Sequence, residues 1–387
     1  MPVLLYLLAL AVFAQGTSEF VFSGLLPLVS DDFGLPLARA GLLTPAFAFG
    51  MVLGAPAMAI LGRRWHPRAA LGAFLALFMV AHAAAALTDS FAVLLATRVL
   101  AAVANAGFLA IALGVSARLV APALRARALA VLLGGTTLAL IAGVPLGAAI
   151  GQALGWRATL WVIAAACDPV LWAVVRSPRE RFGAPAELPA RGAVFEELRV
   201  LRVPGLRWVL ASAVLVNAAT FGSLTFLSAI ALAGGVSASW VPALLGLFGV
   251  GAFLGTIAAG RLGDRHWRTA MCVAGPTLAI GWFGAAALVG RPAPLWAAVG
   301  VLGALSFLCG TLLIGRIMAL SAGAATLSGA FATVALNLGA IGGPLLAGPA
   351  LDGLGSHGPF LVSGALVTLG VLSWWFSVGI LGRSTKR

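Results

Sequence analysis

Only a few ionisable side chains of this 387-residue sequence stand inside long apolar runs, and they are the first candidates for chemistry. Glu19 lies in the first run beside Gln15, Thr17 and Ser18, and Arg98 lies in the fourth. A charge at the centre of a bilayer costs roughly 3 kcal/mol or more, so such a residue is a functional candidate by default. Because burial favours the neutral form of a carboxyl group, Glu19 is suited to bind a proton and release it again.

These residue types leave some alternatives open. Glu19 is predicted to couple proton movement to a second process and to contact a substrate, and the alternative is a structural, hydrogen-bonded acid. Arg98 is predicted to favour ionised Glu19 or to move when the proton leaves, unless its head group reaches the outer interface. Asp168, beside Pro169 in the sixth run, is predicted as a second proton site, although it can instead cap a helix or face water.

The remaining titratable side chains inside or near the runs predict no cofactor. His82, in the third run, is more typical of a hydrogen-bonded packing histidine than of a functional one. The other three histidines lie in loops, and the three cysteines lie in apolar runs at unrelated spacings. Neither pattern is typical of a metal site or a disulfide framework. We therefore expect no metal, no other cofactor and no catalytic residue set.

Amide and aromatic side chains in the apolar runs predict a site for a neutral, amphipathic molecule. Such a ligand requires an apolar cavity with a few oriented polar groups. An amide in lipid without a partner is costly, so the amides are the better candidates, whereas a single aromatic more often faces lipid or the core. The predicted substrate-binding residues are Gln15, Glu19, Phe20, Asn105, Phe108, Asn217, Phe221 and Asn337.

The composition indicates what must hold these side chains. Hydrophobic residues make up 61% of the chain and charged residues 9%, whereas soluble domains carry roughly 25% charged residues. A lipid bilayer must therefore cover most of the surface. Runs of about twenty apolar residues cross the hydrocarbon core as helices, because the backbone must satisfy its own hydrogen bonds there. Twelve such runs occur, at 3–29, 41–61, 69–88, 91–117, 128–151, 157–175, 207–233, 240–260, 269–289, 294–316, 323–350 and 359–381.

Arginine placement predicts the orientation of these helices. Loops on the side of both termini hold 20 of the 24 basic residues, and the opposite loops hold three. Since cytoplasmic loops are rich in Lys and Arg, both termini are predicted to be cytoplasmic. The net charge of +13 does not indicate nucleic-acid binding, because the basic residues form short clusters between apolar runs. The first run is too long for a signal peptide and is expected to be a retained helix.

The polar stretch 176–206 divides the runs into two sets of six. We predict one six-helix bundle over 1–175, a cytoplasmic linker over 176–206, and a second bundle over 207–387. Within the linker, residues 195–203 form either a short amphipathic helix on the inner leaflet or a partly ordered tether.

The two halves look like repeats of each other. Residues 11–20 match 213–222, and Gly143-Val144-Pro145-Leu146-Gly147 matches Gly342-Gly343-Pro344-Leu345-Leu346. Parallel repeats of six spans predict a pseudo-symmetric transporter with its substrate near the midplane, between the halves.

Three segments carry a resemblance to a known family. Ala14-Gln15-Gly16-Thr17-Ser18-Glu19-Phe20 resembles the first helix of bacterial chloramphenicol-resistance exporters, Asn105–Ala110 the fourth, and Val216–Phe221 the seventh. The chain thus resembles the major facilitator superfamily, and within it the twelve-helix drug:proton antiporters, over essentially its whole length. The resemblance implies proton-coupled drug efflux by alternating access across the bacterial inner membrane, with antibiotic resistance as its result. Sugar-efflux relatives share the Gly-Thr-x-Glu-Phe opening.

The resemblance also implies gating residues after the second helix of each half. The family motif Gly-x-x-x-Asp-Arg occurs in the second half as Gly260 to Arg265, whereas Arg63 replaces the acid in the first half. Arg64, Asp264 and Arg265 are therefore expected to gate the cytoplasmic side. The alternative for the first-half arginines is a topology signal alone.

The fifth helix resembles the antiporter motif of the family at Gly143, Pro145 and Gly147. Gly143, Gly147 and Gly151 repeat every four residues on one face, a spacing that lets helices approach closely. Pro145 removes one backbone hydrogen bond and permits a bend. Each glycine is expected to serve packing, while the motif as a whole is expected to limit leak during exchange.

Other classes of function fit the sequence less well. A sugar or metabolite exporter of this fold would carry more charged and hydrogen-bonding groups in its runs. An intramembrane enzyme would need a catalytic pair, but no His-Glu-x-x-His, Gly-x-Ser-x-Gly or nucleotide-binding loop occurs. A non-transporting sensor would need a soluble output domain. The expected partners are a small-molecule substrate, protons and the lipid bilayer, and the protein is expected to act as a monomer.

Overall fold

The computed structural model describes residues 1–61, 65–183, 197–263, 265–324 and 327–384. Within these residues the chain is built from helices, and no strand is present. Eleven helical stretches are long and apolar enough to cross a membrane. The last of them, Ser328–Phe376, contains two helices in succession, so twelve spans are described. The predicted all-α membrane fold of twelve transmembrane helices is confirmed.

The first six spans are formed by α1 with α2, by α4, α5 and α6, by α7 to α8, and by α9. The elements of this half are α1 (Val3–Phe20), α2 (Phe22–Phe33), α3 (Leu37–Ala40), α4 (Leu43–Leu61), α5 (Pro67–Leu87), α6 (Phe91–Arg118), η2 (Pro122–Leu124), α7 (Arg125–Leu138), η3 (Ala139–Gly143), α8 (Val144–Leu154) and α9 (Trp156–Arg176).

The other six spans are α11 to α16. In the described residues between α9 and α11, η4 and η5 are short 3-10 helices. The elements are η4 (Arg179–Phe182), η5 (Leu198–Arg202), α11 (Pro204–Ala233), η6 (Ala238–Trp240), α12 (Val241–Leu262), α13 (Trp267–Ala287), α14 (Pro292–Leu320), α15 (Ser328–Leu354), η7 (Gly355–His357) and α16 (Gly358–Ser384).

Two of the predicted spans are irregular. The first is divided at Val21, where the Ser23 hydroxyl donates to the Phe20 carbonyl at 2.7 Å. A serine bonded back to its own helix in this way bends it. The fifth span contains the π-helical turn η3 and, two residues after its end, Pro145, which has no N–H to donate to a helical hydrogen bond.

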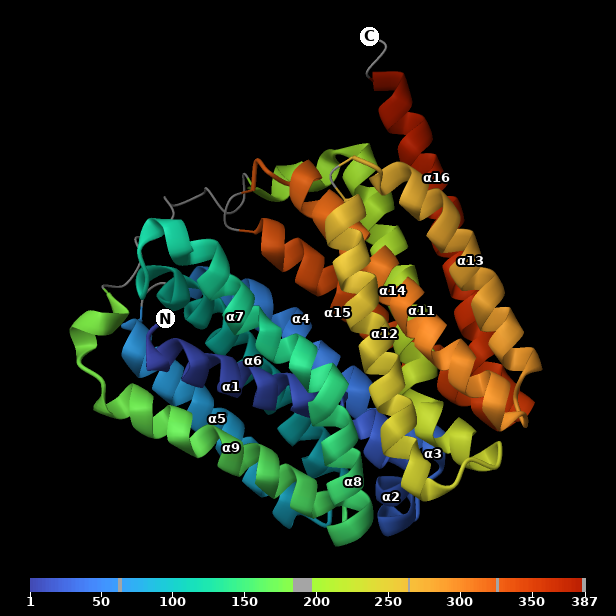
Figure 1. Ribbon diagram of the computed structural model, residues 1–387, viewed down its shortest axis with the longest axis horizontal. Coiled ribbons are helices and arrows are strands. Elements are labelled where there is room, and N and C mark those ends of the chain that lie inside the picture. Colours follow the sequence, from blue (N-terminus) through green and yellow to red (C-terminus); the bar gives the residue numbers. More distant parts are fainter. Residues whose placement is uncertain (62–64, 184–196, 264, 325–326, 385–387) are drawn as a thin grey trace.

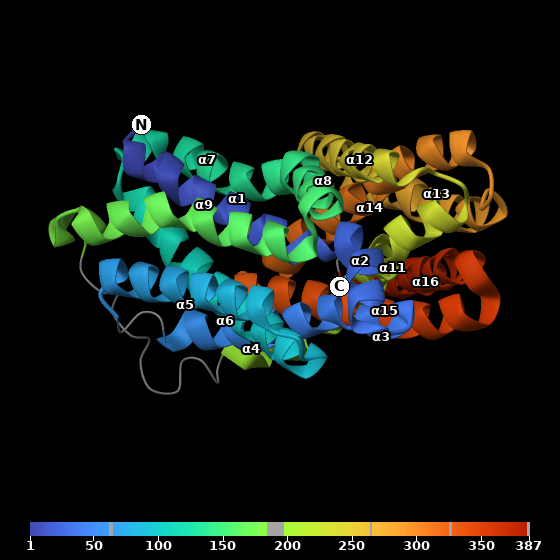
Figure 2. The same cartoon turned by 90° about the horizontal axis from the view of Figure 1, so that it is seen from below.

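The helices of the two halves meet mainly at the ends opposite to the Arg-rich loops. Contacts across this surface, here called the seam, join α2 with α11, α3 with α15, and α8 and η3 with α12. In addition, α4 of the first half packs against α15 of the second half. Figure 1 shows the two bundles converging where α2, α3 and α8 lie and diverging toward both termini. Figure 2 places α5 and α9 on one side and α13 and α16 on the other.

Close backbone approach builds part of the seam. A Cβ added to Gly249 of α12 would overlap the carbonyl of Leu140 in η3, and one added to Gly246 would stand 3.2 Å from Cγ of Pro145. Buried apolar side chains of the first half, among them Phe20 and Val144, belong to the same hydrophobic cluster as the core of the second half. The seam is therefore apolar and tightly packed at its outer end.

The end of the polar stretch packs on the second half. Of the predicted segment 195–203, residues 195 and 196 lie outside the described residues, and η5 covers Leu198–Arg202. Val200 and Leu201 pack against the core of the second half. The carboxylate of Glu197 accepts a hydrogen bond of 2.9 Å from the Leu327 N–H, directly before α15. The short helix thus contacts α11 and α15.

Candidate functional site

Arg98 lies in α6 with its guanidinium inside the first bundle. The residue is 2% exposed, and it donates to the Ser18 hydroxyl at 2.8 Å and to the Ser18 carbonyl at 2.9 Å. Its guanidinium carbon stands 4.6 Å from the ring centre of Phe22 and 4.4 Å from that of Phe47, which are cation–π distances. Arg98 therefore does not reach the outer interface, and it joins α6 to the bend between α1 and α2.

His82 completes a chain of hydrogen bonds with Ser18. Its Nδ1 lies 2.8 Å from the Phe78 carbonyl, and its Nε2 lies 2.8 Å from the Ser18 hydroxyl. Because a carbonyl can only accept, Nδ1 carries the proton, so Nε2 accepts from Ser18 and the Ser18 oxygen accepts from Arg98. The histidine is a buried, hydrogen-bonded one, as expected. Its link to the first helix was not predicted, since no sequence signal shows which helix it faces.

Glu19 follows Ser18 but takes no part in this chain of bonds. Its side chain is half-buried, and among the described residues its carboxylate has no hydrogen bond and no ion pair within 4.0 Å. The charge of Arg98 nevertheless acts on it across a longer distance. An arginine held by Ser18 thus acts on a carboxylate that has no hydrogen bond of its own among the described residues, and proton exchange at Glu19 stays a prediction.

Two buried amides of the first half have few hydrogen-bond partners or none. Gln15 is fully buried, and neither its amide nitrogen nor its amide oxygen has a hydrogen-bond partner in the described structure. Asn105 is 6% exposed, and its amide nitrogen contacts only the Met51 sulfur, at 3.8 Å. Gln15 precedes Glu19 by four residues, so both lie on one face of α1. Each unsatisfied buried polar group costs about 1–3 kcal/mol, a cost that a bound ligand or water would offset.

The amides of the second half have protein partners. Asn217 of α11 donates to the Leu336 carbonyl of α15 at 2.6 Å. Asn337 donates to the Thr333 carbonyl of its own helix at 2.9 Å. Asn217 therefore ties α11 to α15, and contact of either amide with a substrate stays a prediction.

The predicted aromatic residues separate into two groups. Phe20 of α1 and Phe221 of α11 meet across the seam with ring centres 5.7 Å apart, and each is 9% exposed. Phe108, by contrast, is fully buried in the core of the first bundle. The structure therefore places Phe108 in the core of the first bundle rather than with Phe20 and Phe221, and its contact with a substrate stays a prediction.

Asp168 is the predicted residue that the structure separates most clearly from the others. Its side chain is exposed on α9, on a helix whose Trp161 and Trp172 are also exposed. Glu19 and Arg98 lie on the inward faces of α1 and α6, so the three groups are not brought together. A role of Asp168 in proton binding has no support from this position.

The predicted gating residues are only partly described. Arg64 and Asp264 lie outside the described residues, and the side chain of Arg265 is exposed beyond the end of α12. Nothing in their surroundings tests a gating role, which stays a prediction.

The glycines of the fifth span pack against the first span, as expected. A Cβ added to Gly143 would overlap the Thr17 hydroxyl, and one added to Gly147 would stand 2.5 Å from Val21. In the second half, a Cβ added to Gly343 would overlap the Ala218 carbonyl of α11. The matching segments of the two halves thus make the same kind of helix contact, and Pro145 points from this contact toward α12.

Gly143→Ala is expected to lower the stability of the protein by about 1–3 kcal/mol, the usual cost of overpacking a filled interior. The matched control is Gly134→Ala in α7, where an added Cβ meets nothing within 4 Å. Thermal unfolding of both variants in detergent measures the difference. Equal unfolding temperatures for the two variants would show that the contact between η3 and α1 is not tight.

Comparisons with known proteins agree with this architecture. Residues 8–336 match the sequence profile of the Major Facilitator Superfamily. A chloramphenicol resistance protein of Streptomyces lividans is 47% identical over 375 residues, which cover 96% of this chain and 95% of that protein. The uncharacterized MFS-type transporter YfhI of Bacillus subtilis is 29% identical, over 94% of this chain and 91% of the relative.

Solved structures of the same fold exist. A bacterial homologue of the human lysosomal transporter Spinster, in an inward-facing and unoccupied conformation, superposes with a TM-score of 0.74 at 17% identity. The superposition covers 97% of this chain and 94% of that one.

Proposed function

Because the chain belongs to the Major Facilitator Superfamily, we propose that it exports small amphipathic drugs, chloramphenicol or related phenicols, in exchange for protons. The protein is a multi-pass membrane protein and a transporter. The bacterial inner membrane is the location that fits its Arg-rich loops, and the chain acts as a monomer. Export by this route confers resistance to the drug.

One observation carries the proposal. The half-buried Glu19 carboxylate lies one turn from the unpaired amide of Gln15 and near the buried Arg98. A neutral drug with hydroxyl and amide groups can satisfy Gln15, and a proton can neutralise Glu19. Since both groups share one face of α1, binding of proton and drug would compete, which is the requirement for exchange.

Alternating access follows from the arrangement of the halves. The units that rock are residues 1–175 and 207–387, joined by the linker 176–206. Contacts at the outer end of the seam, such as those of α8 with α12, correspond to a state closed toward the outside. In this state Glu19 gives its proton to the cytoplasmic side and cargo reaches the site. Opening of the outer contacts would then release cargo and admit a proton.

Drug accumulation in cells tests this function. Expression in a sensitive bacterium is expected to lower chloramphenicol accumulation and to raise the concentration that stops growth, and an uncoupler should remove both effects. A sugar analogue serves as the second compound. Export of the sugar analogue without export of chloramphenicol would replace drug efflux by sugar efflux. Export that survives the uncoupler would contradict proton coupling.

A further inference from the structure

A groove of about 400 Å³ lies between α5 and α9 at the Arg-rich end of the first bundle. Its walls are small residues of one face of α5 and two larger side chains of α9, namely Ala69, Gly72, Ala73, Ala76, Leu171 and Val175. Ala69, Ala73 and Val175 are exposed, so the groove opens at the surface of the protein. Figure 2 shows α5 and α9 on the side of the molecule away from α13 and α16. The groove therefore faces the bilayer and not the second half.

Arg68, in the first turn of α5, lies at the Arg-rich end of this groove. Its Nε donates to the Val174 carbonyl at 3.2 Å, and its Nη2 donates to the Val175 carbonyl. The last carbonyls of a helix have no partner within the helix, so these bonds fix the guanidinium to the end of α9. A guanidinium carries five N–H donors, so the two bonds leave donors for a ligand in the groove.

Positive charge exceeds negative charge at the same end of the groove. Arg179, the first residue of η4, is exposed and also lines the groove. Neither Arg68 nor Arg179 has an ion pair with another described residue. The segment 176–183 carries three arginines and one acid, and the positive end of the α5 helix dipole lies here as well. The Arg-rich end of the groove is thus suited to an anion.

The apolar part of the groove has nearly the depth of one leaflet of the bilayer. Arg68 and Ala76 are eight residues apart on α5, which is about 12 Å along the helix. The hydrocarbon core of a bilayer is about 30 Å thick, so one leaflet contributes about 15 Å. An acyl chain that begins at the level of the arginines can therefore lie in the groove along most of its own leaflet.

We propose that this groove binds one phospholipid with an anionic head group from the cytoplasmic leaflet. The phosphate accepts hydrogen bonds from Arg68 and Arg179, and one acyl chain lies along Gly72, Ala73 and Ala76. Basic groups at the cytoplasmic ends of transmembrane helices attract anionic lipids, which give that membrane surface its negative potential. The bound lipid joins α5, α9 and η4, so it stabilises the first bundle. The inference goes beyond drug export and does not depend on which molecule the protein transports.

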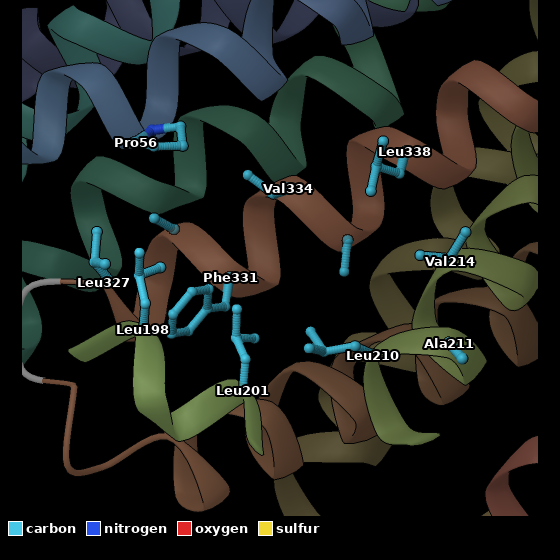
Figure 3. A pocket seen from close by; sticks show the side chains of 12 residues that line it. Pro56, Leu198, Leu201, Leu210, Ala211, Val214, Leu327, Phe331, Val334 and Leu338 are labelled. Atoms are coloured by element: carbon cyan, nitrogen blue, oxygen red, sulfur yellow. The ribbon is translucent and has the colours of Figure 1, made fainter. Parts of the chain in front are cut away.

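The two parts of the groove together favour a lipid over other ligands. A soluble anion such as inorganic phosphate gains nothing from the apolar walls, and an apolar molecule gains nothing from the arginines. Figure 3 shows a contrasting cavity between η5, α11 and α15, whose lining residues are all apolar. No described residue that lines it carries a charge that could hold a head group. An anionic phospholipid uses both parts of the groove between α5 and α9.

Comparison of two phospholipids tests the proposal. In native mass spectrometry of the full chain in detergent, phosphatidylglycerol should bind about tenfold more tightly than phosphatidylcholine with the same acyl chains, because only phosphatidylglycerol carries a net charge. Inorganic phosphate at the same concentration should not displace it. Equal binding of the two phospholipids would overturn the inference. Displacement by phosphate would also overturn it, since the site would then hold a soluble anion.

Arg179→Gln is expected to weaken phosphatidylglycerol binding roughly fivefold, because one cation near the head group is lost. The matched control is Arg125→Gln, which removes an exposed arginine at the beginning of α7 on the same side of the membrane. The control should bind phosphatidylglycerol as tightly as the unmodified protein. If Arg179→Gln binds the lipid no more weakly than Arg125→Gln, the head group does not lie in this groove.

Filling the groove tests the position of the acyl chain. A Cβ added to Gly72 would contact only Leu171, at 3.9 Å, so there is room for a larger side chain. Gly72→Leu should therefore fold, and phosphatidylglycerol should no longer raise its unfolding temperature in detergent. The control is Gly284→Leu in α13, where an added Cβ meets nothing within 4 Å and where the lipid should still stabilise the protein. Equal stabilisation of the two variants by phosphatidylglycerol would contradict the proposed site.

Discussion

Replacing Glu19 by Gln is expected to abolish export of chloramphenicol driven by a proton gradient. The variant keeps the size and hydrogen-bonding capacity of the side chain but cannot bind or release a proton. Because Gln resembles the protonated acid, the halves should still rock, and exchange of labelled for unlabelled drug should persist. Uptake of labelled drug into vesicles, with and without a pH gradient, separates the two activities.

The control for Glu19→Gln is the same chemical change in an exposed acid. Glu180 of η4 is exposed, outside the spans, so Glu180→Gln should keep gradient-driven export. Loss of both activities in Glu19→Gln would indicate a structural acid. Retention of gradient-driven export would remove Glu19 from the mechanism.

Replacing Arg98 by Met is expected to lower gradient-driven export by about tenfold or more. The change removes two charge-assisted hydrogen bonds to Ser18, each worth about 1.5–3 kcal/mol, and leaves the Glu19 carboxylate without a nearby cation. Glu19 then gives up its proton less readily, because an opposite charge favours the ionised form. Vesicle uptake driven by a pH gradient measures the effect, with Arg291→Met, an exposed arginine directly before α14, as control.

Arg98→Lys separates charge from geometry. Lysine keeps the cation but lacks the planar fork that reaches both the hydroxyl and the carbonyl of Ser18. Export by Arg98→Lys should therefore fall between the unmodified protein and Arg98→Met. Full activity of Arg98→Met would show that the cation only holds α6 against the bend in the first span.

Much of the fold followed from composition and spacing. The twelve spans could be predicted because too few charges are present to build a surface that water covers. The spacing of glycines on one face of the fifth span was predicted from the sequence alone, and the structure packs Gly143 and Gly147 against the first span. Glu19 and Arg98 were found because an ionisable residue in an apolar run is rare.

Composition and spacing did not predict which face of each helix points into the protein. A helix that is apolar all round carries no pattern that distinguishes lipid from core. The sequence therefore did not indicate that Phe108 is buried in the first bundle or that Asp168 is exposed on α9. The bond between His82 and Ser18 joins residues 64 positions apart, which no local spacing reveals.

Proton movement that accompanies drug movement is the most direct test of the central claim, namely that Glu19 exchanges a proton for cargo. The purified protein in vesicles with a pH-sensitive dye inside should move protons against the direction of chloramphenicol flow when a drug gradient is imposed. Glu19→Gln vesicles should show drug exchange but no such proton signal. Drug flow without a proton signal in the unmodified protein, or an equal signal in Glu19→Gln, would contradict the account.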